Sequence, residues 1–597
     1  MDSRADRDDG VNTILDAHAA ATTTLQGKNA NGEFWSRPGV AEVVLCATTF
    51  VVYVATLAFG FVYDDRGQIV NNPAIKAWGY IPRYFTSSVR PEIHTGAAGD
   101  YYRPLFLLWL RINDAIFGLS PRGWHFMTVA CHVLVAYLVF HLAVLLAQDR
   151  RTGFLAGLLF ALNPIHIESV AWISGVTDPL MAAPFLLSLI AYLHYRGKGE
   201  KRWLAVALGA FLLALLAKET AVVLPFIVIC WEWPGRQGSA RTPPVGADSS
   251  WQKAAALYLA LDGGYLLARK LAGVGYGAVA VSWTAMIMTW PKMLVFYARH
   301  LLWPFGLSEF YLWSTATVHG FVAGLATLLG LAGGLFLLLR WLDWSAAALS
   351  ALALLVLPIL PALYLPGLTV GDMLHDRYLY LPCAGFALLG ALALERLGST
   401  AIPRRRLVSW MLAGILLAGY AGGTVLQQFQ WASDRLLYTH GLKSAPENDA
   451  VRDNLASTLA ESGEYDRAVP LYLQVLRRDP SFWHSNYNLA YLYYRTEQYA
   501  PAEDYFKRAI RIDASYADEF LYLAVVQLHE GKLDEAIVNA RRAVQLNPKG
   551  EGYHYTLGVL LEAKGLKRQA ADQLALELAH NPGNAQAAQQ LRTIEQR

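Results

Sequence analysis

Long apolar stretches, separated by short polar segments, occupy most of the chain up to about residue 430. Inside a bilayer the backbone has to satisfy its own hydrogen bonds, so an uncharged run of about 20 residues predicts a membrane-spanning helix. The pattern predicts eleven or twelve such helices, at residues 43–63, 124–147, 153–172, 179–195, 203–217, 220–233, 254–271, 284–303, 320–340, 346–365, 378–395 and 407–426.

Clusters of Lys and Arg in the short loops predict the orientation of these helices, because positively charged loops tend to stay in the cytoplasm. Such clusters lie at residues 150–151, 196–202, 236–241 and 404–406. The large loop at 64–122 is therefore expected on the opposite side of the membrane. The last cluster favours eleven crossings, with 284–303 re-entrant or interfacial, which places the region after the last span outside the cytoplasm.

The N-terminal 36 residues differ from the rest of this region. Residues 1–36 are polar and rich in Ala, Thr, Asp and Asn, a composition typical of disordered segments. The first apolar run, 43–63, contains 21 residues without a charge, which is longer than the core of a signal peptide. We therefore expect a disordered leader at 1–36 and a membrane anchor that remains in the protein.

The composition agrees with a membrane protein and excludes several other classes. Of the 597 residues, 55% are apolar and only 16% are charged, and the mean hydropathy is +0.28. The net charge of +3, without a basic stripe, gives no support for a nucleic-acid partner. The four isolated cysteines all fall in apolar segments, where they act as small hydrophobic residues rather than disulfides or zinc ligands.

A 34-residue period begins after the last predicted span. Its columns contain Pro446, Pro480, Pro548 and Pro582, then Leu455, Leu489, Leu523 and Leu557, and then Ala468, Ala502, Ala536 and Ala570. This pattern resembles the tetratricopeptide repeat, whose two helices pack through small residues at these places. We expect four repeats at 449–582 in a domain at 431–597. Stacked repeats form a solenoid, which serves here either to bind extended peptide or as a rigid spacer or dimerisation arm.

Two adjacent carboxylates, Asp64 and Asp65, follow directly on the first predicted span. Like charges this close repel, which raises the pKa of one carboxyl group and supplies a base near neutral pH. An acidic pair after a helix is also a common start for a solvated loop, and spacing alone favours that alternative.

A second polar group lies inside an apolar region, between Asn163 and Asp178. His166, Glu168 and Asp178 follow Pro164, which opens the predicted helix. Broken helices at membrane depth are tolerated where they line protein or a water-filled cavity, so a polar cavity is one interpretation. A buried His–Glu pair that packs helices together is the other.

Basic side chains among aromatic residues form the third group. Tyr102-Arg103 and His375-Asp376-Arg377-Tyr378 each start an apolar stretch, and Lys218-Glu219-Thr220 interrupts another. A guanidinium group matches phosphate well and tolerates partial desolvation. Interfacial tyrosine belts with anchoring arginines, and a mutually satisfied Lys–Glu pair, are the structural alternatives.

The order of these motifs resembles the transmembrane and tetratricopeptide repeat-containing O-mannosyltransferases and their bacterial relatives. The residues that carry the resemblance are Tyr63-Asp64-Asp65, Tyr102-Arg103-Pro104, Asn163-Pro164 with His166, Glu168, Ser169, Trp172 and Gly175, Lys218-Glu219-Thr220, and Arg377 to Pro382. Nearly all of the chain after the leader is covered. The chain departs from the family at Asn163, where many relatives have His, and at Thr177-Asp178, where they usually have a basic residue before the Asp.

The resemblance implies an all-α protein, with a GT-C glycosyltransferase helix bundle at 37–430 followed by the repeats. Members of that class use a polyprenyl-phosphate-linked sugar, typically with inversion, at the outer face of the bundle. The base would be Asp64 or Asp65, with His166 and Glu168 nearby in the catalytic centre. The expected phosphate-binding residues are Arg103, Lys218 and Arg377, and the expected pocket residues are Tyr102, Trp172, Asp178, His375, Asp376 and Tyr378.

These observations lead to one leading hypothesis and two alternatives. The chain is expected to move a sugar from an undecaprenyl- or dolichyl-phosphate carrier to an acceptor hydroxyl, such as a protein Ser or Thr presented by the repeats. No cofactor or metal is expected, although paired carboxylates suit one, and the expected location is a bacterial inner membrane with the repeats in the periplasm. The alternatives are a non-catalytic membrane scaffold and, ranked last, a transporter or ligase.

Overall fold

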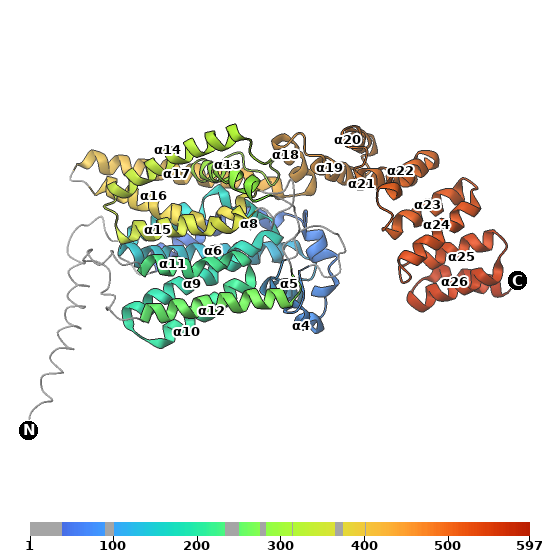
Figure 1. Cartoon of the computed structure of the whole chain (residues 1–597), viewed down its shortest axis with the longest axis horizontal. Coiled ribbons are helices and arrows are strands. Elements are labelled where there is room, and N and C mark those ends of the chain that lie inside the picture. The colour runs from blue at the N-terminus through green and yellow to red at the C-terminus, as the bar shows by residue number, and fades with distance from the viewer. Residues whose placement is uncertain are drawn as a thin grey trace, which may run out of the picture. The chain divides into compact units, whose positions relative to one another are not determined.

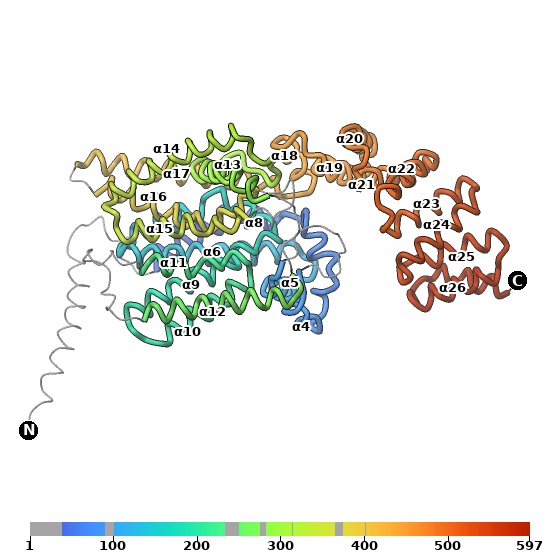
Figure 2. Tube along the Cα trace, in the orientation of Figure 1, coloured from blue at the N-terminus to red at the C-terminus, as the bar shows by residue number. Residues whose placement is uncertain are grey.

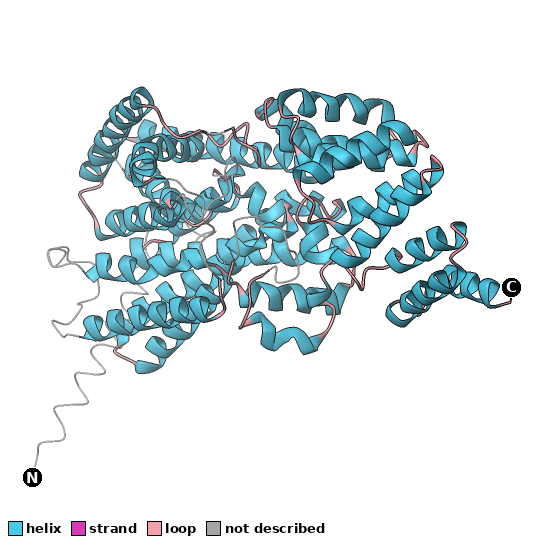
Figure 3. Ribbon diagram, turned by 45° about the vertical axis from the view of Figure 1, so that its right-hand side comes forward, coloured by secondary structure: helices cyan, strands magenta, loops and turns pink. Residues whose placement is uncertain are grey.

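The computed structural model describes residues 39–89, 101–232, 250–274, 282–312, 314–364, 374–399 and 402–596. In these residues all regular structure is helical and no strand occurs, which confirms the all-α prediction (Figure 3). The chain divides into two compact units, residues 1–433 and 434–597 (Figures 1 and 2). The predicted leader at 1–36 lies outside the described residues.

The first unit is a bundle of apolar helices. Six helical segments of the described chain are long and apolar enough to cross a membrane: Val40–Ala58 (α3 and η2), Pro121–Ala147 (α6), Ile173–Lys198 (η7 and α9), Val318–Trp341 (α14), Ala346–Leu363 (α15 and η9) and Pro403–Trp431 (α17 and η12). A bent pair, α7 (Arg150–Ala161) with the segment Pro164–Ala171, makes a seventh if it is one span.

Shorter or less apolar helices occupy the other predicted spans. They are α10 (Lys201–Ala217), α11 (Leu224–Glu232), α12 (Ser250–Leu271), α13 (Trp283–Leu302) and α16 (Pro382–Gly398). Two more helices, α4 (Ile81–Tyr84) and α5 (Pro104–Phe117), lie in the predicted outer loop. Eleven or twelve crossings therefore stays a prediction.

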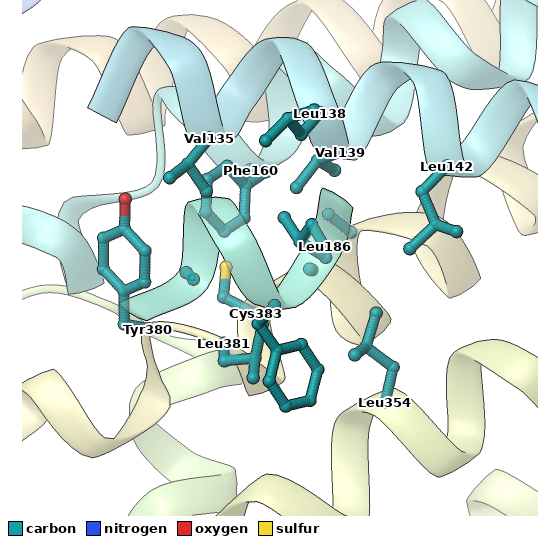
Figure 4. Packing of buried hydrophobic residues seen from close by; sticks show 14 of the residues in the cluster. Val135, Leu138, Val139, Leu142, Phe160, Leu186, Leu354, Tyr380, Leu381 and Cys383 are labelled. Carbon is teal, nitrogen blue, oxygen red and sulfur yellow. The ribbon is translucent and has the colours of Figure 1, made fainter. Parts of the chain in front are cut away.

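Buried side chains from distant parts of the chain form one continuous core in this unit. Val135, Val139 and Leu142 of α6, Phe160 of α7 and Cys383 at the start of α16 all belong to this cluster (Figure 4). All four cysteines are free. The core holds α6, α7 and α16 together and fixes the segments that follow them.

The break after α7 is built from two residues. Pro164 has no backbone N–H and so cannot continue the helix, and the Asn163 side chain accepts a hydrogen bond from the Ile165 backbone N at 3.0 Å. The chain then forms three short helical turns, η6 (Pro164–His166), α8 (Ile167–Ala171) and η7 (Ile173–Val176), all of them buried. The polar motif around Glu168 is therefore carried by irregular backbone enclosed in protein.

The second unit is the predicted array of helix pairs, which confirms the repeat region. Its helices are α18 (Asp434–Ser444), α19 (Asp449–Glu461), α20 (Tyr465–Arg478), α21 (Trp483–Arg495), α22 (Tyr499–Ile512), α23 (Ala517–His529), α24 (Leu533–Leu546), α25 (Tyr553–Ala563), α26 (Lys567–His580) and α27 (Ala585–Glu595). The alanine column at positions 468, 502, 536 and 570 is fully buried. Small side chains there let the paired helices approach closely.

The turn inside each repeat needs a left-handed residue. Gly463, Gly531 and Gly565 take φ angles of 79°, 77° and 83°. The second repeat has Glu497 at this place, with φ of 59°. A non-glycine residue in this region costs about 1–2 kcal/mol.

Replacing Glu497 with Gly should stabilise the second repeat. Glycine removes the strain of about 1–2 kcal/mol, but its greater conformational freedom in the unfolded chain costs about 0.5–1 kcal/mol. The net gain in the free energy of unfolding is therefore about 0.5–1 kcal/mol. Hydrogen–deuterium exchange on the full chain in detergent should show slower exchange at α21 and α22. Gly531→Ala, the matched reverse change, should speed exchange at α23 and α24; equal rates in all three proteins would refute the assignment.

Gly175 in η7 sits directly against the Glu168 motif. A Cβ atom there would lie 2.4 Å from the Glu168 carbonyl oxygen and 3.1 Å from the Trp172 ring. Gly175→Ala should therefore lower the stability of the first unit by about 1–3 kcal/mol, because backbone has to move. Gly197→Ala is the control, since nothing lies within 4 Å of its Cβ position. Thermal unfolding in detergent tests the pair, and equal melting temperatures would contradict the prediction.

Candidate functional site

The two adjacent carboxylates have different surroundings. Asp65 is fully buried, and its Oδ1 accepts hydrogen bonds from the backbone N of Ser174 at 2.9 Å and from its Oγ at 2.6 Å. Its Oδ2 accepts one from the Val62 backbone N at 3.1 Å. Asp65 therefore ties the start of the outer loop to η7.

Asp64 is the accessible member of the pair. Its side chain is partly exposed and accepts a hydrogen bond from Gln68 Nε2 at 3.0 Å. The residue before it, Tyr63, has a φ of 54°, a left-handed conformation that is uncommon for a bulky side chain and is worth a functional interpretation. Asp64 is therefore partly exposed, whereas the protein itself surrounds Asp65.

The pKa of Asp65 is raised to about 7, chiefly because burial penalises the charged form. The hydrogen bonds from Ser174 and Val62 act in the opposite direction, and the neighbouring charge of Asp64 adds to the rise. Part of the Asp65 population is therefore protonated near neutral pH.

Each of the three cations predicted to bind phosphate is held by carboxylates. Arg103 makes a two-pronged contact with Glu219, with Nε to Oε2 at 2.9 Å and Nη2 to Oε1 at 2.6 Å. Lys218 Nζ lies 2.6 Å from Asp178 Oδ1. A charge buried without a partner is costly, so these pairs explain how the fold keeps the cations.

Arg377 contacts two carboxylates. Its Nη1 bonds to Glu168 Oε1 and lies 3.2 Å from Glu309 Oε1, while its backbone N donates to Glu168 Oε2 at 3.0 Å. His375 Nδ1 lies 3.4 Å from Glu309 Oε1 and 3.6 Å from Glu168 Oε1. Glu168, Glu309 and His375 thus form one buried cluster beneath the Arg377 side chain.

Aromatic rings connect these charged groups. Tyr378 lies 5.6 Å from Lys218 Nζ and 5.7 Å from the Arg377 guanidinium carbon. The same guanidinium lies 5.5 Å from the Trp172 ring, and Trp172 packs 5.6 Å from Tyr63. Lys218 also interacts electrostatically with Arg103 and Arg377. The motifs that are far apart in sequence therefore meet in one region that begins beside Asp64.

The cations differ in accessibility. The side chains of Arg103 and Arg377 are 14% and 18% exposed, whereas that of Lys218 is 2% exposed. The two arginines are therefore the more accessible cations, while Lys218 is enclosed in the protein.

Two other predicted residues, His166 and Tyr102, have packing or hydrogen-bonding roles. His166 lies among aromatic rings, 4.3 Å from Phe160 and 4.6 Å from Tyr380, and in the described part of the chain neither of its ring nitrogens makes a hydrogen bond, so it does not pair with Glu168. Tyr102 donates to the Phe85 carbonyl at 3.0 Å.

Asp376 accepts a hydrogen bond from Tyr311 at 2.6 Å and lies 3.0 Å from His300 Nδ1. Its catalytic or pocket role, like those of His166 and Tyr102, stays a prediction.

Glu309 was not among the predicted site residues. It lies between α13 and α14 in the segment Leu307-Ser308-Glu309-Phe310, and its side chain is 1% exposed. The available signal was a single acidic residue between two apolar stretches. Sequence alone gives no partner for it, because Glu168 and Arg377 are distant along the chain.

Comparisons with known proteins include matches to the repeat region alone. A family model described as "Tetratricopeptide repeat" matches residues 454–517. The crystal structure of YrrB, described as a tetratricopeptide repeat protein with an unusual peptide-binding site, is 26% identical over a match covering 26% of this chain and 81% of that one, with a TM-score of 0.25.

Relatives extend over most of the chain. Protein O-mannosyl-transferase TMTC3 of Mus musculus is 26% identical over 93% of this chain and 65% of the relative, and the Homo sapiens protein of the same name is 25% identical over 91% and 65%. Tmtc1 of Drosophila melanogaster is 34% identical over 30% of this chain and 21% of its own length. The chain thus spans about two thirds of the length of the two TMTC3 relatives. With the apolar bundle and the repeats both present, the chain is similar over most of its length to transmembrane and tetratricopeptide repeat-containing proteins named as protein O-mannosyl-transferases.

Proposed function

We propose that this chain is a membrane glycosyltransferase that moves a sugar from a polyprenyl-phosphate carrier to an acceptor hydroxyl. The observation that carries the proposal is the joining of Asp64, Trp172, Arg377, Tyr378, Lys218 and Arg103 into one region. A lipid-linked sugar brings its own phosphate leaving group. Its transfer requires a base for the acceptor and cations for the phosphate, and both kinds of group occur here.

In this mechanism Asp64 is the base. It takes the proton from the acceptor hydroxyl while that oxygen bonds to the anomeric carbon and the bond from that carbon to the phosphate oxygen breaks. Arg103 and Arg377 meet the charge that develops on the phosphate, since both are partly exposed. The buried Lys218 adds to the positive electrostatic potential that stabilises this charge. No metal takes part in the bond-making step, and inversion at the sugar follows from direct displacement.

The acceptor is proposed to be Ser or Thr of a protein, and the sugar to be mannose. Both follow the names of the relatives. In this proposal the repeats supply a surface that binds an extended peptide. We further propose that the site and the repeats lie on the extracytoplasmic side of a bacterial inner membrane, following the charges of the short loops.

Asp64→Asn should abolish most of the transfer activity. Removal of a general base typically costs a factor of about 10² to 10⁴ in rate, and the substitution keeps the size and one acceptor oxygen of Asp64. The measurement is transfer of labelled mannose from a synthetic polyprenyl phosphate to acceptor protein by the purified chain. Asp114→Asn is the control, because Asp114 is also a loop carboxylate with cationic partners, Lys76 and Arg111.

The scaffold alternative gives the opposite result. A scaffold would keep its cellular function in Asp64→Asn and lose it when the repeats are disrupted. Full transfer activity in Asp64→Asn would refute the base assignment. Absence of transfer in the unsubstituted chain with every polyprenyl-phosphate sugar tested would refute the proposed reaction.

Asp65→Asn should change the pH dependence of stability. The folded pKa of Asp65, about 7, lies above the unfolded value of about 3.9. Between these values the folded state binds more protons, so Asp65 makes stability fall as pH rises from about 4 to about 7, with little further change above. Melting temperatures in detergent from pH 4.5 to 8 should fall less steeply with pH in Asp65→Asn than in the unsubstituted chain. Identical slopes would show that Asp65 is ionised throughout.

A further inference from the structure

The buried cluster beneath Arg377 carries more negative than positive charge. Two carboxylates, Glu168 and Glu309, face one guanidinium, and His375 is a further titratable member of the cluster. The side chains of Glu168, Glu309 and His375 are each 5% exposed or less. With both acids ionised and His375 neutral, the cluster has a net charge of −1. A buried net charge is unfavourable, so the cluster holds either a further cation or a proton shared between its carboxylates.

The spacing of the ligand atoms fits a metal ion. One ligand atom from each of Glu168, Glu309 and His375 lies within 4.8 Å of the other two. Two atoms bonded at about 2.1 Å to one tetrahedral ion are about 3.4 Å apart. His375 Nδ1 stands 3.4 Å from one carboxylate oxygen and 3.6 Å from the other, which are long for hydrogen bonds but close to this separation.

The ligands are also held in place independently. Glu168 Oε2 accepts a hydrogen bond from the Arg377 backbone N at 3.0 Å, a contact that remains when the Arg377 side chain moves. Glu309 Oε2 is buried and makes no hydrogen bond within the described part of the chain. The three residues come from α8, from the segment after α13 and from the residue before η11 (Asp376–Leu379). The fold therefore brings the three ligands together from three separate segments.

We propose that Glu168, Glu309 and His375 bind a divalent transition-metal ion such as Mn²⁺ or Zn²⁺. One imidazole nitrogen with two carboxylates is a ligand set that suits these ions better than Ca²⁺ or Mg²⁺, which prefer oxygen alone. Two carboxylates and one divalent ion balance in charge. The ion enters where the Arg377 guanidinium now lies, since Arg377 is the most exposed member of the cluster.

The ion has a consequence for Arg377. Cations repel, so the metal and the guanidinium compete for the same two carboxylates, and a bound metal turns Arg377 outward. If the proposed transfer reaction holds, the released guanidinium is then available to the donor phosphate. This consequence rests on the proposed function, whereas the metal site itself does not.

The test measures metal content rather than activity. The purified full chain in detergent is treated with a chelator, incubated separately with Mn²⁺, Zn²⁺ or Mg²⁺, desalted and analysed by inductively coupled plasma mass spectrometry. We expect about one Mn²⁺ or Zn²⁺ per chain and little Mg²⁺. Glu309→Gln and His375→Gln should each lower the retained ion at least tenfold. Asp114→Asn, whose carboxylate lacks an imidazole partner, should retain it.

Arg377→Gln gives a second and independent measurement. It removes the competing cation and should lower the Kd for Mn²⁺ about tenfold, a gain that damage to the fold cannot produce. No retained ion in the unsubstituted chain, or equal retention in Glu309→Gln and His375→Gln, would overturn the proposal. So would an unchanged or higher Kd for Mn²⁺ in Arg377→Gln, which would show that the carboxylates share a proton and that Arg377 is their only cation.

Discussion

The cost of burying charge governs the first unit. Its apolar helices provide a low-dielectric surrounding in which an isolated cation or carboxylate is costly. Three cations near the predicted site are kept by pairing: Arg103 with Glu219, Lys218 with Asp178, and Arg377 with Glu168 and Glu309. The pairs are therefore required by the fold as well as suited to function. A site that recognises phosphate has to exchange these partners, and the two partly exposed arginines are the groups best placed to do so.

Much of the fold could be predicted because its signals are local. A 34-residue period specifies a repeat whose helices contact neighbours close in sequence, so columns such as the buried Ala468 and Ala502 appeared directly in the pattern. The break at Pro164 was also local, since proline acts on its own turn. The number of membrane crossings was harder to predict. α10 and α16 have 17 residues each, and apolar runs of that length lie between a buried helix and a full span.

The sequence predicted which residues belong to the site, but it did not predict which of them contact one another. The order of the motifs identified Asp64, Asp65, Glu168 and Arg377 as candidate site residues. Nothing in the sequence, however, distinguishes Asp64 from Asp65. The distinction arises because Ser174, 109 residues away, donates two hydrogen bonds to Asp65. Glu309 was not predicted for the same reason, because its place in the site depends on contacts with Glu168 and Arg377, which are distant in sequence. Contacts between distant segments carry this information, and a single sequence does not display them.

The two acids at the start of the outer loop illustrate how one motif can divide its roles. A general base has to contact solvent and substrate, whereas a tie between a loop and the bundle has to exclude both. Two adjacent residues can meet these opposite requirements because consecutive side chains point in different directions from the backbone. Here the left-handed turn at Tyr63, with φ of 54°, precedes both acids. Asp65 faces Ser174 in the protein and Asp64 remains partly exposed, so the buried acid holds the backbone beside the accessible acid.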